Sequence, residues 1–257
     1  MNILSVFRFH YVNLFKKTNI LIVMVFLLIY CVSSFLIYGA APTYDILASV
    51  YFVFYAPIIP TLDLFRALLL VTVFLLLFNH FIQTELRDRS SYILLRIKNM
   101  KLYFHSLLST MMLFTFVFIL IGYVIALLLT FVFYKVEIPQ TEQFLYDINW
   151  RLLFKQYLLL VLSIILLLFI NNVIVLLFKN IEIATLIIFI LFICSFYYVL
   201  FNPNQYIYIP FLYGFFNFQP SIGDRSFLLE STILCISNIV LYMLSYFIYQ
   251  RKKDFFS

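Results

Sequence analysis

Long apolar runs separated by short polar stretches cover almost the whole chain. A membrane-spanning helix needs about 20 mainly apolar residues. Six runs approach or exceed this length, and they cover residues 20–38, 64–82, 107–134, 158–178, 183–201 and 227–249. The pattern therefore predicts an all-α membrane protein with six transmembrane helices. Because no internal repeat or low-complexity linker interrupts it, we expect residues 1–257 to form one membrane domain.

Two further apolar segments are not predicted to span the membrane. Residues 1–19 repeat apolar side chains at helical spacing with basic residues between them, which predicts an amphipathic helix at the inner membrane interface. A cytosolic tail with accidental periodicity is the alternative. Residues 46–59 form an apolar run that contains Pro57 and stops at Pro60. This run is too short to span, so we expect an interfacial or re-entrant segment on the outer face.

Composition excludes a soluble protein. Only 11% of the residues are charged and 65% are hydrophobic, whereas soluble domains typically have about 25% charged residues. The first apolar run is longer than the roughly 7–15 residues of a signal-peptide core, so we expect a retained span. The cysteines Cys31, Cys194 and Cys235 lie inside apolar runs without a C-x-x-C pair. We expect them to be buried apolar residues rather than disulfide or metal ligands.

Basic residues gather on one side of the predicted membrane. With six spans, the side that holds both termini carries 12 of the 17 Lys and Arg residues but only 4 of the 11 acidic residues. These basic residues are Arg8, Lys16, Lys17, Arg87, Arg89, Arg96, Lys98, Lys101, Lys179, Arg251, Lys252 and Lys253. Positively charged loops face the cytoplasm, which predicts cytoplasmic termini. Since topology accounts for the net charge of +6, we expect no nucleic-acid partner.

Motifs for catalysis are absent from the sequence. The four glycines never have the spacing of a P-loop, so the chain does not hydrolyse nucleotide in that way by itself. His10, His80 and His105 lie far apart without an H-E-x-x-H motif, and no G-x-S-x-G marks a serine nucleophile. We therefore expect a protein that is not an enzyme alone and holds no metal or cofactor of its own.

A few polar residues interrupt the predicted spans. Asn79, Asn171 and Asn172 lie in the inner halves of their spans. They either hydrogen-bond neighbouring helices or line a translocation path. Arg66 and Glu230 lie near outer ends, where they either snorkel to the interface or pair with each other or with Asp63.

The longest charged interruption is the stretch ELRDRSSYILLRIKNMKLYFH at residues 85–105. It predicts a short basic helix on the inner membrane face, which serves either as an anchor to anionic lipid or as a handle for a cytoplasmic partner. Within it an acidic residue ends the second span, a small pair opens the helix, a leucine pair follows and basic residues close it. These are Glu85, Ser90–Ser91, Leu94–Leu95, and Lys98 with Lys101.

Together with six spans, an amphipathic N-terminal helix and a long outer connection between spans five and six, this stretch resembles the ABC-2-type transporter permeases. The chain departs from the family where a small-Pro-Ser-Arg ending is common, since it has Ile97-Lys98-Asn99-Met100 there. Its size and composition are similar to the small permeases of low-GC Gram-positive bacteria. These include exporters of phenol-soluble modulins and transporters for lantibiotic self-immunity.

The resemblance implies that residues 85–105 form a coupling helix, which docks on a separate ATPase subunit that binds ATP and Mg²⁺. The implied coupling residues are Glu85, Arg89, Ser90, Tyr92, Ile93, Leu94, Arg96 and Ile97. Ile93 and Ile97 share a helix face, and Arg89 and Arg96 are suited to carboxylates on the partner. The alternative is a solvated or lipid-bound loop that serves topology alone.

The expected protein is thus the permease subunit of an ATP-driven exporter in the bacterial cell membrane. It would work with two ATPase copies and a second permease copy or a homologous permease. Almost uncharged spans favour an apolar or amphipathic cargo such as an amphipathic peptide, a bacteriocin or a lipid. A membrane scaffold or sensor without transport is the competing hypothesis.

Overall fold

Six long helices form the bundle in a computed structural model that describes residues 3–38, 46–54, 60–84, 100–133, 150–216 and 224–251. They are α2 (Lys17–Tyr38), α4 (Pro60–Gln83), α6 (Met100–Phe133), α7 (Trp150–Phe178), α8 (Ile181–Phe201) and α9 (Asp224–Arg251). All six are long and apolar enough to cross a membrane. The predicted all-α architecture with six spans is confirmed.

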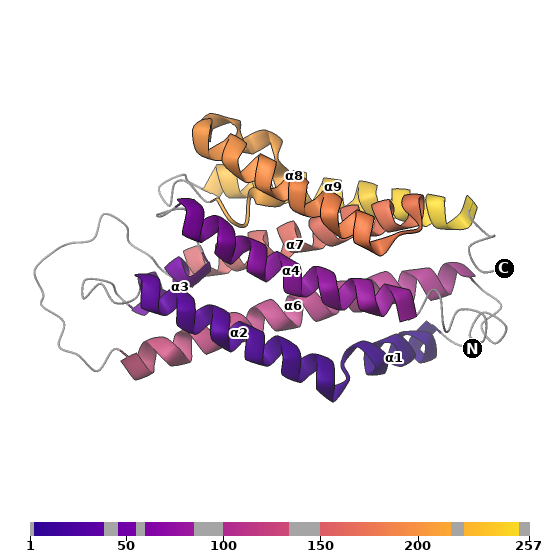
Figure 1. Cartoon of the computed structure of the whole chain (residues 1–257), viewed down its shortest axis with the longest axis horizontal. Helices are drawn as coiled ribbons and strands as arrows, with labels where there is room; N and C mark the ends of the chain where they lie inside the picture. Colours follow the sequence, from indigo (N-terminus) through magenta and orange to yellow (C-terminus); the bar gives the residue numbers. More distant parts are fainter. Residues whose placement is uncertain are drawn as a thin grey trace, which may run out of the picture.

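The N-terminal helix and the last turn of α9 lie at the same end of the bundle (Figure 1). The end of α4 and the start of α6 also lie there, and we call it the inner end. The charge distribution assigns it to the cytoplasm. The outer end is the one where α6 ends and α7 begins.

The helix α7 forms the centre of the bundle. Its side chains are buried along nearly its whole length, and it contacts α3, α4, α6, α8 and α9. A helix that is apolar on all sides is typical of such a buried position. The peripheral helices instead expose apolar side chains outward, including Leu21 and Ile29 on α2 and Met243 on α9. Lipid is the natural environment of these faces.

Only one of the three cysteines is in the interior, as Cys31 is buried whereas Cys194 and Cys235 are exposed. The prediction that all three are buried was wrong for two of them. In a membrane protein an apolar side chain is equally suited to lipid and to the interior, so hydrophobicity alone does not indicate which way it faces.

Several helices extend beyond the apolar runs that predicted them. The helix α6 begins at Met100 rather than near 107, and α7 begins at Trp150 rather than near 158. Arg151 is exposed there while Leu153 and Gln156 are buried. The helical alternation of exposed and buried side chains therefore continues outside the hydrocarbon. Hydropathy marks only the part of a helix that crosses lipid, so it placed these first turns of α7 in the outer loop.

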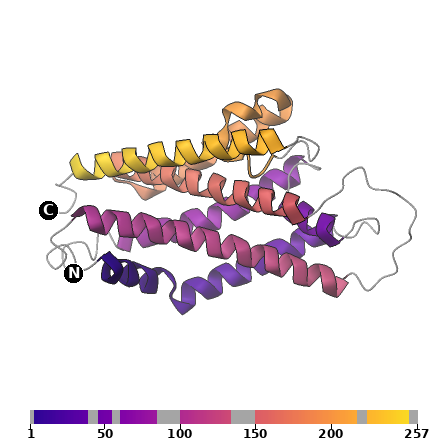
Figure 2. The ribbon, with the colours of Figure 1, turned by 180° about the vertical axis from the view of Figure 1, so that it is seen from behind.

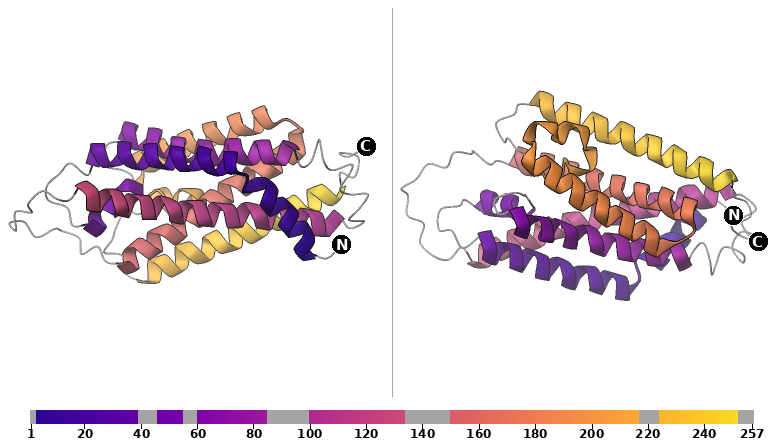
Figure 3. Two further views of the ribbon diagram at one scale, coloured as in Figure 1. Left: turned by 90° about the horizontal axis from the view of Figure 1, so that it is seen from below. Right: turned by 45° about the horizontal axis from the view of Figure 1, so that its top comes forward.

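The N-terminal helix α1 (Ile3–Leu14) crosses the inner end and contacts α6 (Figure 3). Its buried face consists of Val6, His10 and Leu14, spaced four residues apart, whereas Tyr11 and Val12 are exposed. The predicted amphipathic helix is confirmed. The sequence indicates an apolar stripe of Ile3, Leu4, Phe7, Tyr11, Leu14 and Phe15. Of these, Leu14 shares the protein-facing side with Val6 and His10, whereas Tyr11 is exposed.

The short helix α3 (Ile46–Phe54) does not span the membrane, since nine residues reach only about 13 Å. It packs between α2, α6 and α7, with Val50, Tyr51, Val53 and Phe54 buried. The expectation of a non-spanning segment at the outer end is confirmed for these residues, but they lie inside the bundle rather than on its surface.

After α8 the chain forms two 3₁₀ helices, η2 (Pro203–Tyr208) and η3 (Pro210–Leu212), at the outer end (Figure 1, orange). The following residues 213–216 are all buried. The ring of Phe215 lies 5.3 Å from that of Phe192, and Phe216 lies 4.5 Å from Phe196. Because Phe192 is nine residues before the end of α8, the segment turns back roughly 13 Å along that helix. The apolar run at residues 207–218 is too short to span the membrane, which predicts a position in the outer interface. This prediction is wrong for residues 211–216, which are buried in the bundle.

Gly214 allows this segment to approach α7 closely. Its backbone N–H donates a hydrogen bond to Ser163 Oγ at 2.9 Å. A Cβ atom added at this glycine would lie 2.4 Å from the Cα of Leu160, closer than real Cβ atoms come.

We predict that Gly214→Ala lowers stability by about 1–3 kcal/mol, because the added methyl group would overpack against the α7 backbone. Thermal unfolding in detergent should show a lower Tm. The control is Gly122→Ala, whose Cβ would meet only side-chain tips of Phe54 and Leu27 at 3.2 and 3.3 Å. Equal Tm values for the two variants would contradict the close approach at Gly214.

Candidate functional site

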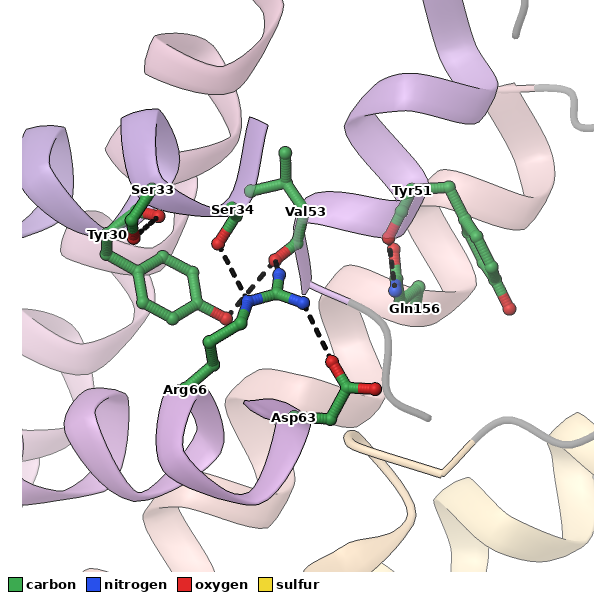
Figure 4. A network of polar contacts seen from close by, with 8 residues as sticks. All are labelled: Tyr30, Ser33, Ser34, Tyr51, Val53, Asp63, Arg66 and Gln156. Carbon is green, nitrogen blue, oxygen red and sulfur yellow. Dashed lines mark hydrogen bonds and ion pairs between the residues drawn. The ribbon is translucent and has the colours of Figure 1, made fainter. Parts of the chain in front are cut away.

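At the outer end, Arg66 of α4 joins three helices (Figure 4). Its Nη1 donates to Asp63 Oδ1 at 2.9 Å, and its Nε donates to Ser34 Oγ on α2 at 3.0 Å. Its Nη2 donates to the backbone carbonyl of Val53, at the end of α3. Of the open alternatives for Arg66, pairing with Asp63 is the one that the structure contains.

The carbonyl of Val53 is one of the groups that a helix leaves unpaired at its C-terminus. A cation there also compensates the partial negative charge of the helix end. The hydroxyl of Tyr30 donates to the same carbonyl at 3.2 Å, and the guanidinium lies 5.7 Å from the Tyr30 ring centroid. Arg66 therefore fixes α3 against α2 and α4.

Gln156 of α7 holds α3 from the other side. Its Nε2 donates to the carbonyl of Tyr51 at 3.1 Å, and its Oε1 accepts from the hydroxyl of Tyr123 on α6 at 3.0 Å. The rings of Phe54 and Tyr123 stack at 4.3 Å. We call the residues Tyr30, Ser34, Asp63, Arg66, Tyr123 and Gln156 the outer network. Sequence reasoning found only its ion pair, because the other partners are placed by tertiary structure.

Two of the predicted translocation-path residues meet in the inner half of the bundle. Asn79 of α4 donates to Thr185 Oγ1 on α8 at 2.8 Å, and Asn171 of α7 donates to Asn79 Oδ1 at 2.6 Å. These are the bonds that the helix-packing alternative describes. Asn172 is fully buried, but its side-chain amide has no hydrogen-bond partner among the described residues.

At the inner end, α1 touches the two helices that flank the basic segment 85–99. The ring of His10 lies 4.7 Å from Tyr103 in the first turn of α6 and 6.1 Å from Phe81 near the end of α4. His10, Phe81 and Tyr103 are all buried, and we call them the inner clamp. His10 was not singled out as a site residue, because a lone histidine gives no sequence signal of such packing.

The predicted coupling residues lie outside the described residues. They are Glu85, Arg89, Ser90, Tyr92, Ile93, Leu94, Arg96 and Ile97. The end of the predicted short helix at 85–105 is described, and residues 100–105 belong to α6. These six residues form the first part of that helix, and two of them, Tyr103 and Phe104, are buried in the bundle.

Within the described part of the chain, no group of three or more His, Cys, Asp and Glu side chains is placed to hold a metal ion. No family model, curated protein or solved structure matches the sequence or the fold.

We predict that Arg66→Met destabilises the protein by about 3–5 kcal/mol, because it leaves the carboxylate of Asp63 buried without its cation. The matched double variant Asp63→Leu with Arg66→Met removes both charges and should recover much of the loss. Both are measured as Tm in detergent. A double variant less stable than the single one would contradict a simple buried pair.

Proposed function

We propose that this chain is the permease subunit of an ATP-driven exporter that moves an apolar or amphipathic cargo, such as an amphipathic peptide or bacteriocin. The observation that carries the proposal is the inner clamp. A partner that pushes on residues 85–99 acts on a segment whose two flanking helices are already joined through His10. Both helices would therefore respond to one force.

The same two helices reach the outer network. On α4, Phe81 of the clamp and Arg66 are 15 residues apart, or about 22 Å. On α6, Tyr103 and Tyr123 are 20 residues apart, or about 30 Å. Continuous helices act as rigid levers, so a displacement at the inner end would be felt at the outer end. This is the mechanical requirement for coupling ATP hydrolysis to transport.

The charge distribution supports a cargo without exposed charge. Among the described residues, the buried charged side chains are Asp63, Arg66 and Glu230, all in the outer parts of their helices. Buried Asn79 and Asn171 in the inner half are uncharged amides. Among the described residues, a charged solute entering from the cytoplasm would find no buried carboxylate, Lys or Arg side chain there, and desolvation would disfavour it.

In this proposal the energy source is a separate ATPase, present in two copies and holding ATP and Mg²⁺. A second copy of the chain or a homologous permease completes the path across the bacterial cell membrane. The amphipathic α1, with exposed Tyr11 and Val12 beside Arg8 and Lys16, would lie against lipid at the inner face.

We predict that Ile93→Asp combined with Ile97→Asp detaches the ATPase, because two carboxylates would enter an apolar docking groove. The tagged chain is purified from its native membrane in mild detergent, and its partners are identified by mass. The control is Ser91→Asp with Asn99→Asp, which adds the same charge on the other side of the expected helix. Purification of the wild-type chain without any P-loop ATPase would overturn the exporter and favour a scaffold or sensor.

We predict that His10→Ala leaves the ATPase bound but weakens its response to cargo. ATPase activity of the purified complex is measured in nanodiscs with and without an 18-residue Leu/Gln amphipathic peptide that has blocked termini and no charged side chain. Stimulation by the peptide should fall several-fold, whereas Tyr11→Ala, on the exposed side of α1, should retain it. Unchanged stimulation in His10→Ala would show that the inner clamp does not transmit the movement.

A further inference from the structure

Buried polar groups differ between the two halves of the bundle. In the outer half, Ser34, Arg66, Gln156 and Ser163 all have hydrogen-bond partners. In the inner half, several buried polar atoms have none among the described residues. They include Asn13 Nδ2 on α1 and, within the spans, Ser106 Oγ, Asn171 Oδ1, both side-chain atoms of Asn172, and Ser245 Oγ.

The unpaired hydroxyls are unusual within this protein. A hydroxyl in a membrane helix ordinarily bonds to the carbonyl four residues before it. Thr110 and Thr115 on α6 do so, at 2.8 and 3.0 Å. Ser106 on the same helix and Ser245 on α9 do not, although Ser245 is fully buried and Ser106 is 3% exposed.

The register of the helices puts Asn172 and Ser245 at the same level of the bundle. The helices α7 and α9 run in the same direction and pack along each other (Figure 2). Asn238 of α9 donates to the carbonyl of Leu162 at 3.1 Å, and further inward the rings of Phe169 and Tyr242 lie 5.9 Å apart. Three residues further along each helix, on the same faces, are Asn172 and Ser245.

The helix α6 joins them at this level. His105 forms a hydrogen bond with the hydroxyl of Tyr242, and its ring stacks on Tyr246 at 4.9 Å. Ser106 is the next residue of α6. We call Ser106, Asn172 and Ser245 the inner polar site. It lies where α6, α7 and α9 meet, one helix turn from the aromatic rings of Phe169 and Tyr242.

An unpaired polar group in this position is costly. Hydrocarbon offers no hydrogen bonds, so each buried unsatisfied group lowers the stability of the fold. Asn172 leaves both a donor and an acceptor unpaired. The same two groups are able to form hydrogen bonds with a ligand that offers an acceptor and a donor. A carboxamide is the same group as a peptide bond, and the two form complementary hydrogen bonds.

Accordingly, we infer that the inner polar site binds the backbone amide groups that an amphipathic peptide helix leaves unpaired at its end, with the nearby aromatic rings contacting its apolar side chains. This inference rests on the proposed function, because it identifies where the cargo is first held. The site lies in the inner half, so the peptide would reach it from the cytoplasm or the inner leaflet. Movement of α9 away from α7 would open it, since the side of α9 that faces away from α6 and α7 is exposed.

The first test is the sign of a stability change. Asn172→Leu replaces an unpaired amide by an apolar group of similar size, so Tm in detergent should rise by a few degrees. The control Asn79→Leu removes two hydrogen bonds that the structure contains, so its Tm should fall. A fall for Asn172→Leu as large as that for Asn79→Leu would overturn the inference, because Asn172 would then have a structural partner.

The second test measures binding without any ATPase. The full chain in nanodiscs is titrated with a fluorescent 18-residue Leu/Gln amphipathic peptide that has blocked termini and no charged side chain. Asn172→Leu should weaken binding at least ten-fold, and Ser245→Ala, which hardly changes volume, should weaken it several-fold. No binding by the wild-type chain would overturn the site. A higher Tm with unchanged peptide affinity would also overturn it and leave only a hydrated gap.

The two proposals fail in different ways. Loss of peptide binding in Asn172→Leu, together with a wild-type chain that purifies without an ATPase, would retain the site and reject the exporter. A bound ATPase with peptide affinity insensitive to Asn172 would retain the exporter and reject the site.

Discussion

Polar groups that this chain places inside the bilayer need partners within the protein, because hydrocarbon supplies none. Arg66 shows how strongly this constraint shapes the fold. Its guanidinium has several donors, and they reach Asp63, Ser34 and the carbonyl of Val53. A nine-residue helix such as α3 would be too short to hold its position by apolar burial alone. The helix leaves its C-terminal carbonyl at Val53 unpaired, and this carbonyl accepts a hydrogen bond from the arginine.

The same constraint makes the two ends of the bundle depend on each other. Asn79, Asn171 and Thr185 join α4 to α7 and α8, while Tyr123 and Gln156 join α6 to α7. The central helix α7 is therefore bonded to both helices that leave the inner clamp. Packing between lipid-facing helices is otherwise weakly specified, since lipid tails are as apolar as leucine. Hydrogen bonds between specific side chains fix which helix faces meet, and they give the bundle one arrangement.

The sequence predicted the parts of this fold that depend on length and composition. Six spans, a non-spanning segment at 46–54 and an amphipathic N-terminal helix follow from apolar runs and their period.

The faces of these elements were less predictable. The apolar stripe on α1 is broad. Its periodicity puts Tyr11 on the apolar face of the helix, whereas tertiary packing buries His10. Aromatic residues suit both a membrane interface and a protein interior, which is why the segment at 211–216 was expected at the interface. The pair Asp63 and Arg66 was predictable from its i, i+3 spacing, but the carbonyl of Val53 was not, because its position depends on how α3 packs.

The inner and outer halves of the bundle differ in how many buried polar groups have hydrogen-bond partners. This difference bears on the end from which the bundle opens. Groups with satisfied hydrogen bonds hold the outer ends of α2, α3, α4, α6 and α7 together, so separating these ends would break several charge-assisted bonds at once. In the inner half, separating α9 from α7 at Asn172 and Ser245 breaks no side-chain hydrogen bond of these two residues, and it lets their polar atoms meet water or a ligand. In the exporter proposed above, α9 would be the helix that moves to admit cargo at the inner end. A cycle that returns to the closed arrangement with net movement of cargo has to draw on an external source of free energy. ATP hydrolysis acting through α4 and α6 would supply that energy at the helices that also hold the outer network.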